Sequence, residues 1–313
     1  MYFERRAKVN FPGSVTIVEV GPRDGLQSEP NFVPTNEKIE LIECLSGTGL
    51  KRIEITSFVS LGAIPQLGDS ENVANGLRKR PGVRYSALVP NYKGLERAIE
   101  ARIDEIALFV SASETHNQKN VRMPISRSLS GFRQIAETAL NHGMHMRGYI
   151  VTAFGCEYEG RVPPERVEEI AGEYLAMGVR EISLGDTTGM ANPVMVRQVV
   201  RRLTSILGEA ALALHFHDTR GTGMANVVAA IEEGARIFDC SVGGLGGCPF
   251  PRMVSGNIPT EDLVGMLHEM GIDTGIDIDA LIECARFARA ITKRELPGRL
   301  IGAGKVNWQG STV

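Results

Sequence analysis

The chain has 313 residues, 43% of them hydrophobic, which is enough for one large α/β domain with additions or for two smaller domains. Its net charge of −3 and its 6% of aromatic residues give no support for binding to nucleic acid or to a membrane surface. We expect no membrane-spanning segment and no secretory signal, because no apolar run is long enough and the first residues lack an apolar core.

The five cysteines are dispersed along the chain and form no Cys-x-x-Cys pair. This pattern argues against a disulfide framework and a structural zinc site, and it favours a reducing, cytoplasmic location. Cys44 and Cys284 fall on predicted helical faces, where we expect them to be core residues.

Short runs rich in β-branched residues alternate with longer helical patterns. The predicted strands are 15–20, 52–56, 85–89, 105–110, 146–152, 181–184, 211–216 and 237–242. The predicted helices begin near residues 35, 70, 93, 128, 164, 193, 224, 260 and 278. Residues 111–127 are predicted to form a long polar surface loop.

Eight strand–helix units, repeating at intervals of roughly 30 residues, predict a (β/α)8 TIM barrel. We assign residues 1–270 to the barrel and residues 271–313 to a C-terminal helix and tail packed on it. A doubly wound open sheet is the alternative, ranked lower because no Gly-x-Gly-x-x-Gly motif follows the first strand. Catalytic groups of a barrel lie where its strands end, so polar residues at those positions are the candidates.

Two histidines stand at the end of the seventh predicted strand, as His215-Phe216-His217. On a strand, this spacing places both imidazoles on one face and Phe216 on the other. Neutral imidazole is a good ligand for divalent metals. A single His-x-His motif more often holds one core histidine and one surface histidine, so the surrounding residues must decide.

Charged residues follow other strands at the same end of the predicted barrel. Arg23 and Asp24 stand in a turn, where they suit an oxyanion and a metal, or form only an internal ion pair. Glu54, if it points inward from the second strand, needs a charged partner, whether its role is functional or structural. Asp186 follows the sixth strand, where it orients a ligand or merely forms a turn.

A glycine-rich loop, residues 241–250, follows the eighth strand and carries Cys248. Such a loop can move and can bring backbone close to a ligand. A cysteine there can act as an acid or a nucleophile if its pKa is lowered. Asn257 follows, and its amide oxygen is a fair ligand for a hard divalent ion, although an Asn beside a Gly is usually a turn residue.

Together these segments resemble the HMG-CoA (3-hydroxy-3-methylglutaryl-CoA) lyase family, barrel-fold metallolyases with an Asp-Arg-Glu signature. The resemblance runs from about Val15 to Ile291 and rests on residues 19–27, 183–187, 215–219, 241–250 and 255–257. The glycine-rich cysteine loop is its most specific part. The Arg-Asp pair and the His-x-His motif also occur in relatives that condense acetyl-CoA with 2-oxo acids.

The resemblance implies a homodimeric lyase that cleaves HMG-CoA to acetyl-CoA and acetoacetate. It implies that Arg23, with Gln27, binds substrate, that Arg23 stabilises the developing enolate, and that Cys248 is an acid or base on a mobile loop. Glu54 and Asp186 are implied to be polar partners around metal and substrate. The base stays open between Asp24 and a neighbour. The implied ligands of Mg²⁺ or Mn²⁺ are Asp24, His215, His217 and Asn257.

Four places depart from the family pattern: Ala63, Glu157, residues 114–123 and residues 251–254. All lie in predicted loops that would shape the acyl pocket or its lid, so the acyl group stays open. One alternative substrate is a related 3-hydroxyacyl-CoA, such as a longer-branched 3-hydroxyglutaryl-CoA or citramalyl-CoA. A non-catalytic binder of CoA or of a carboxylate is the alternative from another class.

Overall fold

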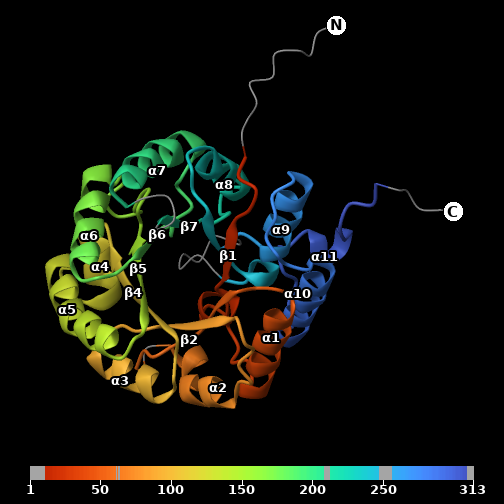
Figure 1. Ribbon diagram of the computed structural model, residues 1–313, viewed down its shortest axis with the longest axis horizontal. Helices are drawn as coiled ribbons and strands as arrows, with labels where there is room; N and C mark the ends of the chain where they lie inside the picture. The colour runs from red at the N-terminus through yellow and green to blue at the C-terminus, as the bar shows by residue number, and fades with distance from the viewer. Residues whose placement is uncertain (1–10, 61, 63, 208–211, 247–255, 309–313) are drawn as a thin grey trace, which may run out of the picture.

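A computed structural model describes residues 11–60, 62, 64–207, 212–246 and 256–308. Eight parallel strands close into a barrel in the order β1 to β8, and β8 pairs with β1 (Figure 1). This confirms the predicted TIM barrel. The strands are β1 Thr16–Glu19, β2 Arg52–Ser57, β3 Arg84–Leu88, β4 Glu105–Ser111, β5 His145–Val151, β6 Glu181–Gly185, β7 Leu212–His215 and β8 Ile237–Cys240.

Helices surround the barrel on all sides in the view of Figure 1. Their apolar faces pack against the strands, as expected for a buried parallel sheet. The helices are α1 Thr35–Gly47, α2 Ser70–Gly76, α3 Tyr92–Glu100, α4 Glu114–Val121, α5 Ile125–Asn141, α6 Pro164–Ala176, α7 Pro193–Leu207, α8 Gly223–Glu232, α9 Thr260–Glu269, α10 Ile278–Thr292 and α11 Leu300–Ala303. In the part of the chain that the structure describes, no helix combines the length and apolarity needed to cross a membrane.

The prediction of a loop over residues 111–127 is wrong, because α4 lies within it. Its sequence has no apolar periodicity, but the Ser113 side chain caps it by accepting a hydrogen bond from the His116 amide. Strands β7 and β8 also end earlier than predicted. Beyond them the chain pairs with residues 257–259, His217 with Asn257 and Ser241 with Pro259, so it leaves the barrel sheet.

The C-terminal segment packs on the barrel beside its N-terminal part. Helix α10 contacts α1, and the bridge between Ser14 and Asp273 joins the segment to the residues that precede β1. A disulfide links Cys44 of α1 to Cys284 of α10. The prediction from the cysteine pattern, which argued against disulfides, is therefore wrong for this pair. Cys156 and Cys240 are free and buried.

We expect the disulfide to stabilise the fold, because it closes a loop of 240 residues between two helices. Removing a disulfide typically costs about 2–4 kcal/mol. Reductant should therefore lower the free energy of unfolding in urea by an amount in that range. The double variant Cys44→Ser/Cys284→Ser is the control, since reductant should leave its stability unchanged. Five free thiols in the unreduced protein would contradict the pairing.

Candidate active site at the barrel mouth

A tight turn places Arg23 and Asp24 at the barrel mouth. Residues Gly21–Gly25 form one π-helical turn, in which the amides of Arg23, Asp24 and Gly25 all donate to the Val20 carbonyl. A Cβ at Gly21 would lie 2.6 Å from Glu19 Oε1, which the amides of Gly21 and Val242 hold in place, so a larger residue would disturb this turn. The sequence Gly-Pro-Arg-Asp-Gly thus builds the turn that presents both charged side chains.

Arg23 is held as a cation by two carboxylates. Its Nε donates to Glu54 Oε1, and its terminal nitrogen donates to Asp24 Oδ1 at 2.6 Å. Glu54 also accepts from the Tyr149 hydroxyl at 2.9 Å, so the inward glutamate has the charged partner that its burial requires. Burial alone would lower the pKa of Arg23, but Glu54 and Asp24 outweigh it and raise that pKa. The fixed guanidinium suits an oxyanion.

Asp24, His215 and His217 converge next to Arg23. One ligand atom from each lies within 4.8 Å of the others. The two Nε2 atoms are 3.2 Å apart, and His215 Nε2 lies 3.8 Å from Asp24 Oδ2. Phe216 points the other way into the apolar core, against Phe154, as the strand alternation predicts. Two imidazole nitrogens and a carboxylate in this arrangement fit a divalent cation.

Asn257 completes the group. Its Nδ2 donates to Asp24 Oδ2 at 2.7 Å and to the Leu245 carbonyl at 3.1 Å. Its Oδ1 is buried and has no hydrogen-bond partner among the described residues. An unsatisfied buried amide oxygen costs free energy, so a bound cation would supply a partner for it. The structure therefore brings together the four residues that were predicted as ligands.

The charges of the cluster also suit a cation. Burial opposes ionisation of Asp24, but Arg23, the two histidines and the Asn257 hydrogen bond outweigh it and lower the pKa of that carboxyl. Burial, helped by His215, lowers the pKa of His217 to about 4. At neutral pH, Asp24 is a carboxylate and His217 a neutral imidazole, which are the ligating forms.

Gln27 makes a hydrogen bond within the protein that the sequence did not specify, and Asp186 forms the turn that was one of its two predicted roles. Gln27 Nε2 donates to Asp24 Oδ1 at 2.7 Å, so it holds that carboxylate in place. Asp186 Oδ1 accepts from the Ala191 amide, which is the turn-forming role, while its Oδ2 is buried without a hydrogen-bond partner in the described chain. Burial, only partly offset by hydrogen bonds, raises the pKa of Asp186 to about 7.

Cys248, Ala63 and residues 251–254 lie outside the described residues, and Glu157 is exposed. Sequence reasoning missed three buried residues inside the barrel: Arg147, Tyr149 and Asp239. The first two are alternate residues of a predicted strand, and this inward polar spacing was the available signal. The carboxylate partners of Arg147 and Tyr149 lie 92 and 95 positions away in the sequence, so the sequence alone could not identify them.

Two buried glutamates hold the glycine-rich segment after β8, where Val242–Gly244 form a short turn, η4, with Gly243 at φ +66°. Glu19 Oε1 accepts from the Val242 amide and Glu261 Oε2 from the Gly243 amide, both at 2.9 Å. Burial, only partly offset by these bonds, raises the pKa of Glu19 to about 7 and that of Glu261 to about 8.

Glu261→Gln should reduce the loss of thermal stability between pH 6 and pH 9. The Glu261 carboxyl ionises near its ordinary pKa of 4.5 when unfolded but near 8 when folded. The folded chain thus binds more protons, and stability falls as pH rises through that window. Melting temperatures at both pH values measure the effect. The exposed control Glu40→Gln should follow the parent protein, and an equal loss in Glu261→Gln would contradict this account.

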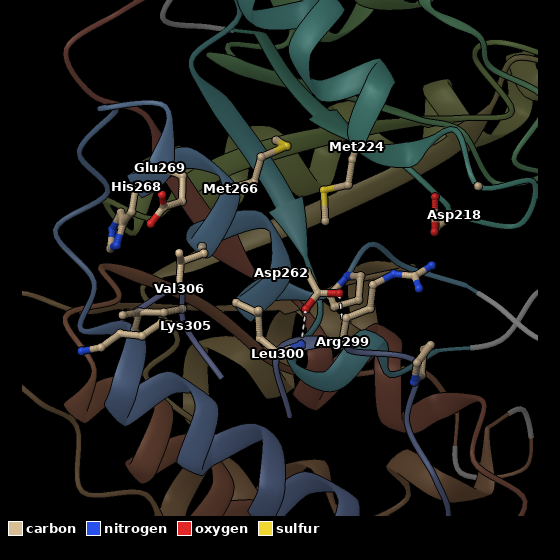
Figure 2. A pocket seen from close by; sticks show the side chains of 15 residues that line it. Asp218, Met224, Asp262, Met266, His268, Glu269, Arg299, Leu300, Lys305 and Val306 are labelled. Carbon is tan, nitrogen blue, oxygen red and sulfur yellow. Dashed lines mark hydrogen bonds between the residues drawn. The ribbon is translucent and has the colours of Figure 1, made fainter. Parts of the chain in front are cut away.

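A separate pocket of about 670 Å³ lies between α8, α9 and the C-terminal tail (Figure 2). Met224, Met266 and Leu300 contribute its apolar lining. Its carboxylates are already engaged, since Asp218 accepts from the Gly223 amide and Asp262 from the amides of Arg299 and Leu300. None of the four predicted metal ligands lines this pocket, so it is distinct from the cluster at the barrel mouth.

Residues 14–288 match the family model described as HMGL-like. The chain is 47% identical over 289 residues to the hydroxymethylglutaryl-CoA lyase of Bacillus subtilis, covering 92% of this chain and 97% of the relative. It is 43% identical over 293 residues to the mitochondrial hydroxymethylglutaryl-CoA lyase of Homo sapiens, covering 94% and 90%. The solved structure of an HMG-CoA lyase from Acinetobacter baumannii with coenzyme A and 3-methylmalate superposes with a TM-score of 0.92 at 46% identity, covering 99% of this chain and 100% of that one.

Proposed function

Because this chain belongs to the HMGL-like family, we propose that the cluster of Asp24, His215, His217 and Asn257 binds one divalent cation at the centre of a carbon–carbon lyase. The reaction is the cleavage of HMG-CoA to acetyl-CoA and acetoacetate. The observation that carries the proposal is the convergence of two histidine Nε2 atoms, 3.2 Å apart, beside the Asp24 carboxylate. The non-catalytic alternative has no support from relatives that are named lyases along nearly their whole length.

The cation, Mg²⁺ or Mn²⁺, would lower the pKa of the tertiary hydroxyl of the substrate and fix its orientation. Asp24 and His217 would hold it in the forms that they adopt at neutral pH. Asp186 interacts electrostatically with His215. Its pKa of about 7 and its Oδ2, which makes no hydrogen bond with the described residues, suit it to hold a proton beside the cluster.

Breaking the bond between C2 and C3 leaves negative charge on the thioester enolate. Arg23 is the buried cation beside the cluster, and its hydrogen bond to Glu54 fixes the orientation of the guanidinium. A preorganised cation in a site shielded from water stabilises such charge strongly. We propose Cys248, on the glycine-rich loop, as the acid that then protonates the enolate carbon; this role rests on the sequence motif.

The acyl-CoA partner, the homodimer and the cytoplasmic location are parts of the same proposal. A related lyase was solved with coenzyme A, which supports an acyl-CoA substrate. Some relatives are named cytoplasmic, which supports the proposed location, and others are named mitochondrial. The homodimer rests on the family resemblance.

A second substrate class is kept because the related lyase holds 3-methylmalate, a branched hydroxy-dicarboxylate. The decisive assay supplies HMG-CoA or citramalyl-CoA with Mg²⁺ or Mn²⁺ and follows acetyl-CoA. We expect HMG-CoA to yield equal amounts of acetyl-CoA and acetoacetate, with activity lost in EDTA and restored by either metal. Turnover of citramalyl-CoA alone would overturn the substrate assignment, and full activity in EDTA would overturn the metal.

A further inference from the structure

Asp239 of β8 is a buried carboxylate that reaches the back of His215. Its Oδ2 lies 3.4 Å from His215 Nδ1, the ring nitrogen opposite the one that faces the cluster. Ser183 Oγ donates to the same Oδ2 at 3.0 Å, while Oδ1 accepts from Arg147. His215 Nδ1 is itself buried and makes no hydrogen bond of regular geometry with the described residues, so Asp239 is the acceptor within reach.

We propose that Asp239 is a positioning residue that accepts the Nδ1 proton of His215 and thereby leaves the Nε2 lone pair free for the cation. This inference rests on the proposed function, because it concerns a ligand of the proposed metal site. A neutral imidazole carries one proton, so a proton on Nδ1 makes Nε2 the ligating nitrogen. Carboxylates behind metal-binding histidines commonly fix the ring in this way.

Arg147 compensates the negative charge of the buried Asp239 carboxylate inside the barrel. The Arg147 side chain is 1% exposed and lies between Asp239 and Glu181, whose Oε1 is 2.7 Å from Arg147 Nε. If Asp239 is removed, Arg147 still pairs with the carboxylate of Glu181. Glu181 pairs with Arg52 and Arg147 and, among the described residues, forms no hydrogen bond or ion pair with His215. Glu181→Gln can therefore separate a loss of Arg147 pairing from a loss of His215 orientation.

The same hydrogen-bond chain continues to the other side of the site. Arg147 donates to the Tyr149 hydroxyl at 3.0 Å, Tyr149 donates to Glu54 at 2.9 Å, and Glu54 accepts from Arg23. Asp239 therefore anchors one end of a buried network whose other end holds the guanidinium beside the cluster. Buried hydrogen bonds that connect side chains of several strands restrict their movement, which suits the positioning of a ligand.

The first experiment measures Mn²⁺ affinity from the electron paramagnetic resonance signal of the free ion. Asp239→Asn should weaken Mn²⁺ binding about 10- to 100-fold. Glu181→Gln should stay within about twofold of the parent protein, since its effect is confined to the far side of Arg147. Unchanged affinity in Asp239→Asn, or an equal loss in Glu181→Gln, would overturn the inference. Failure of the parent protein to bind Mn²⁺ would instead overturn the proposed metal site.

The second experiment needs no change at Asp239 and so remains decisive if Asp239→Asn does not fold. Histidines of the metal-free parent protein are labelled with ¹⁵N, and the His215 signals are identified by their loss in His215→Gln. Two-bond proton–nitrogen correlations distinguish the tautomers. A proton on Nδ1 is the expected result, and a proton on Nε2 would overturn the role of Asp239.

Discussion

Arg23→Gln is expected to lower kcat for HMG-CoA by about a thousandfold while Mn²⁺ affinity changes only a few-fold. Loss of a single preorganised donor to a developing oxyanion typically costs 10²- to 10³-fold, and Arg23 supplies a full charge. Since this charge appears only as the bond breaks, the loss should fall on kcat more than on KM. Steady-state kinetics, together with Mn²⁺ titration of the same preparation, measure both quantities.

Two controls separate the charge of Arg23 from its placement. Glu54→Gln keeps the guanidinium but weakens the bond from its Nε, so we expect a smaller loss, about tenfold. Arg197→Gln removes a surface guanidinium that pairs with Glu232, and it should leave kcat unchanged. A kcat within tenfold of the parent value in Arg23→Gln, or a loss no larger than in Glu54→Gln, would contradict the assignment.

His217→Ala should weaken Mn²⁺ binding by at least a hundredfold and reduce HMG-CoA cleavage by a similar or larger factor. The ring provides one of two imidazole nitrogens in the cluster, and no other described histidine is positioned to replace it. Isothermal titration with Mn²⁺ gives both stoichiometry and affinity. His268→Ala, on α9, is the matched control, because His268 forms a hydrogen bond with Thr274 and lines the separate pocket. One Mn²⁺ per chain with parent affinity in His217→Ala would refute the ligand set.

The barrel could be predicted because each strand is a short apolar run and each helix a longer periodic one. This pattern is set by local burial, which the sequence records directly. Helix α4 escaped prediction because its stability comes from a cap at Ser113 and from Asn117 bonds rather than from an apolar stripe. The ends of β7 and β8 were not predicted correctly because they are set by pairing with residues 257–259, a contact between distant parts of the chain.

The four proposed ligands were predicted from the family resemblance, and they lie together because the closed barrel brings the ends of its strands together. Side-chain partners were harder to predict. Glu54 needed a charged partner, but only the folded chain identifies Arg23, and Gln27 turned out to hold Asp24. The pairing of Asp239 with Arg147 joins residues 92 positions apart, and no local pattern encodes such a contact.

We propose above all that two histidines and a carboxylate at the barrel mouth bind the catalytic cation. Electron spin echo modulation of the Mn²⁺-loaded protein tests it most directly, because it detects nitrogen nuclei bonded to the metal. We expect couplings to two histidine nitrogens in the parent protein and to one in His215→Ala. A spectrum without nitrogen coupling, or one that is unchanged in His215→Ala, would contradict it.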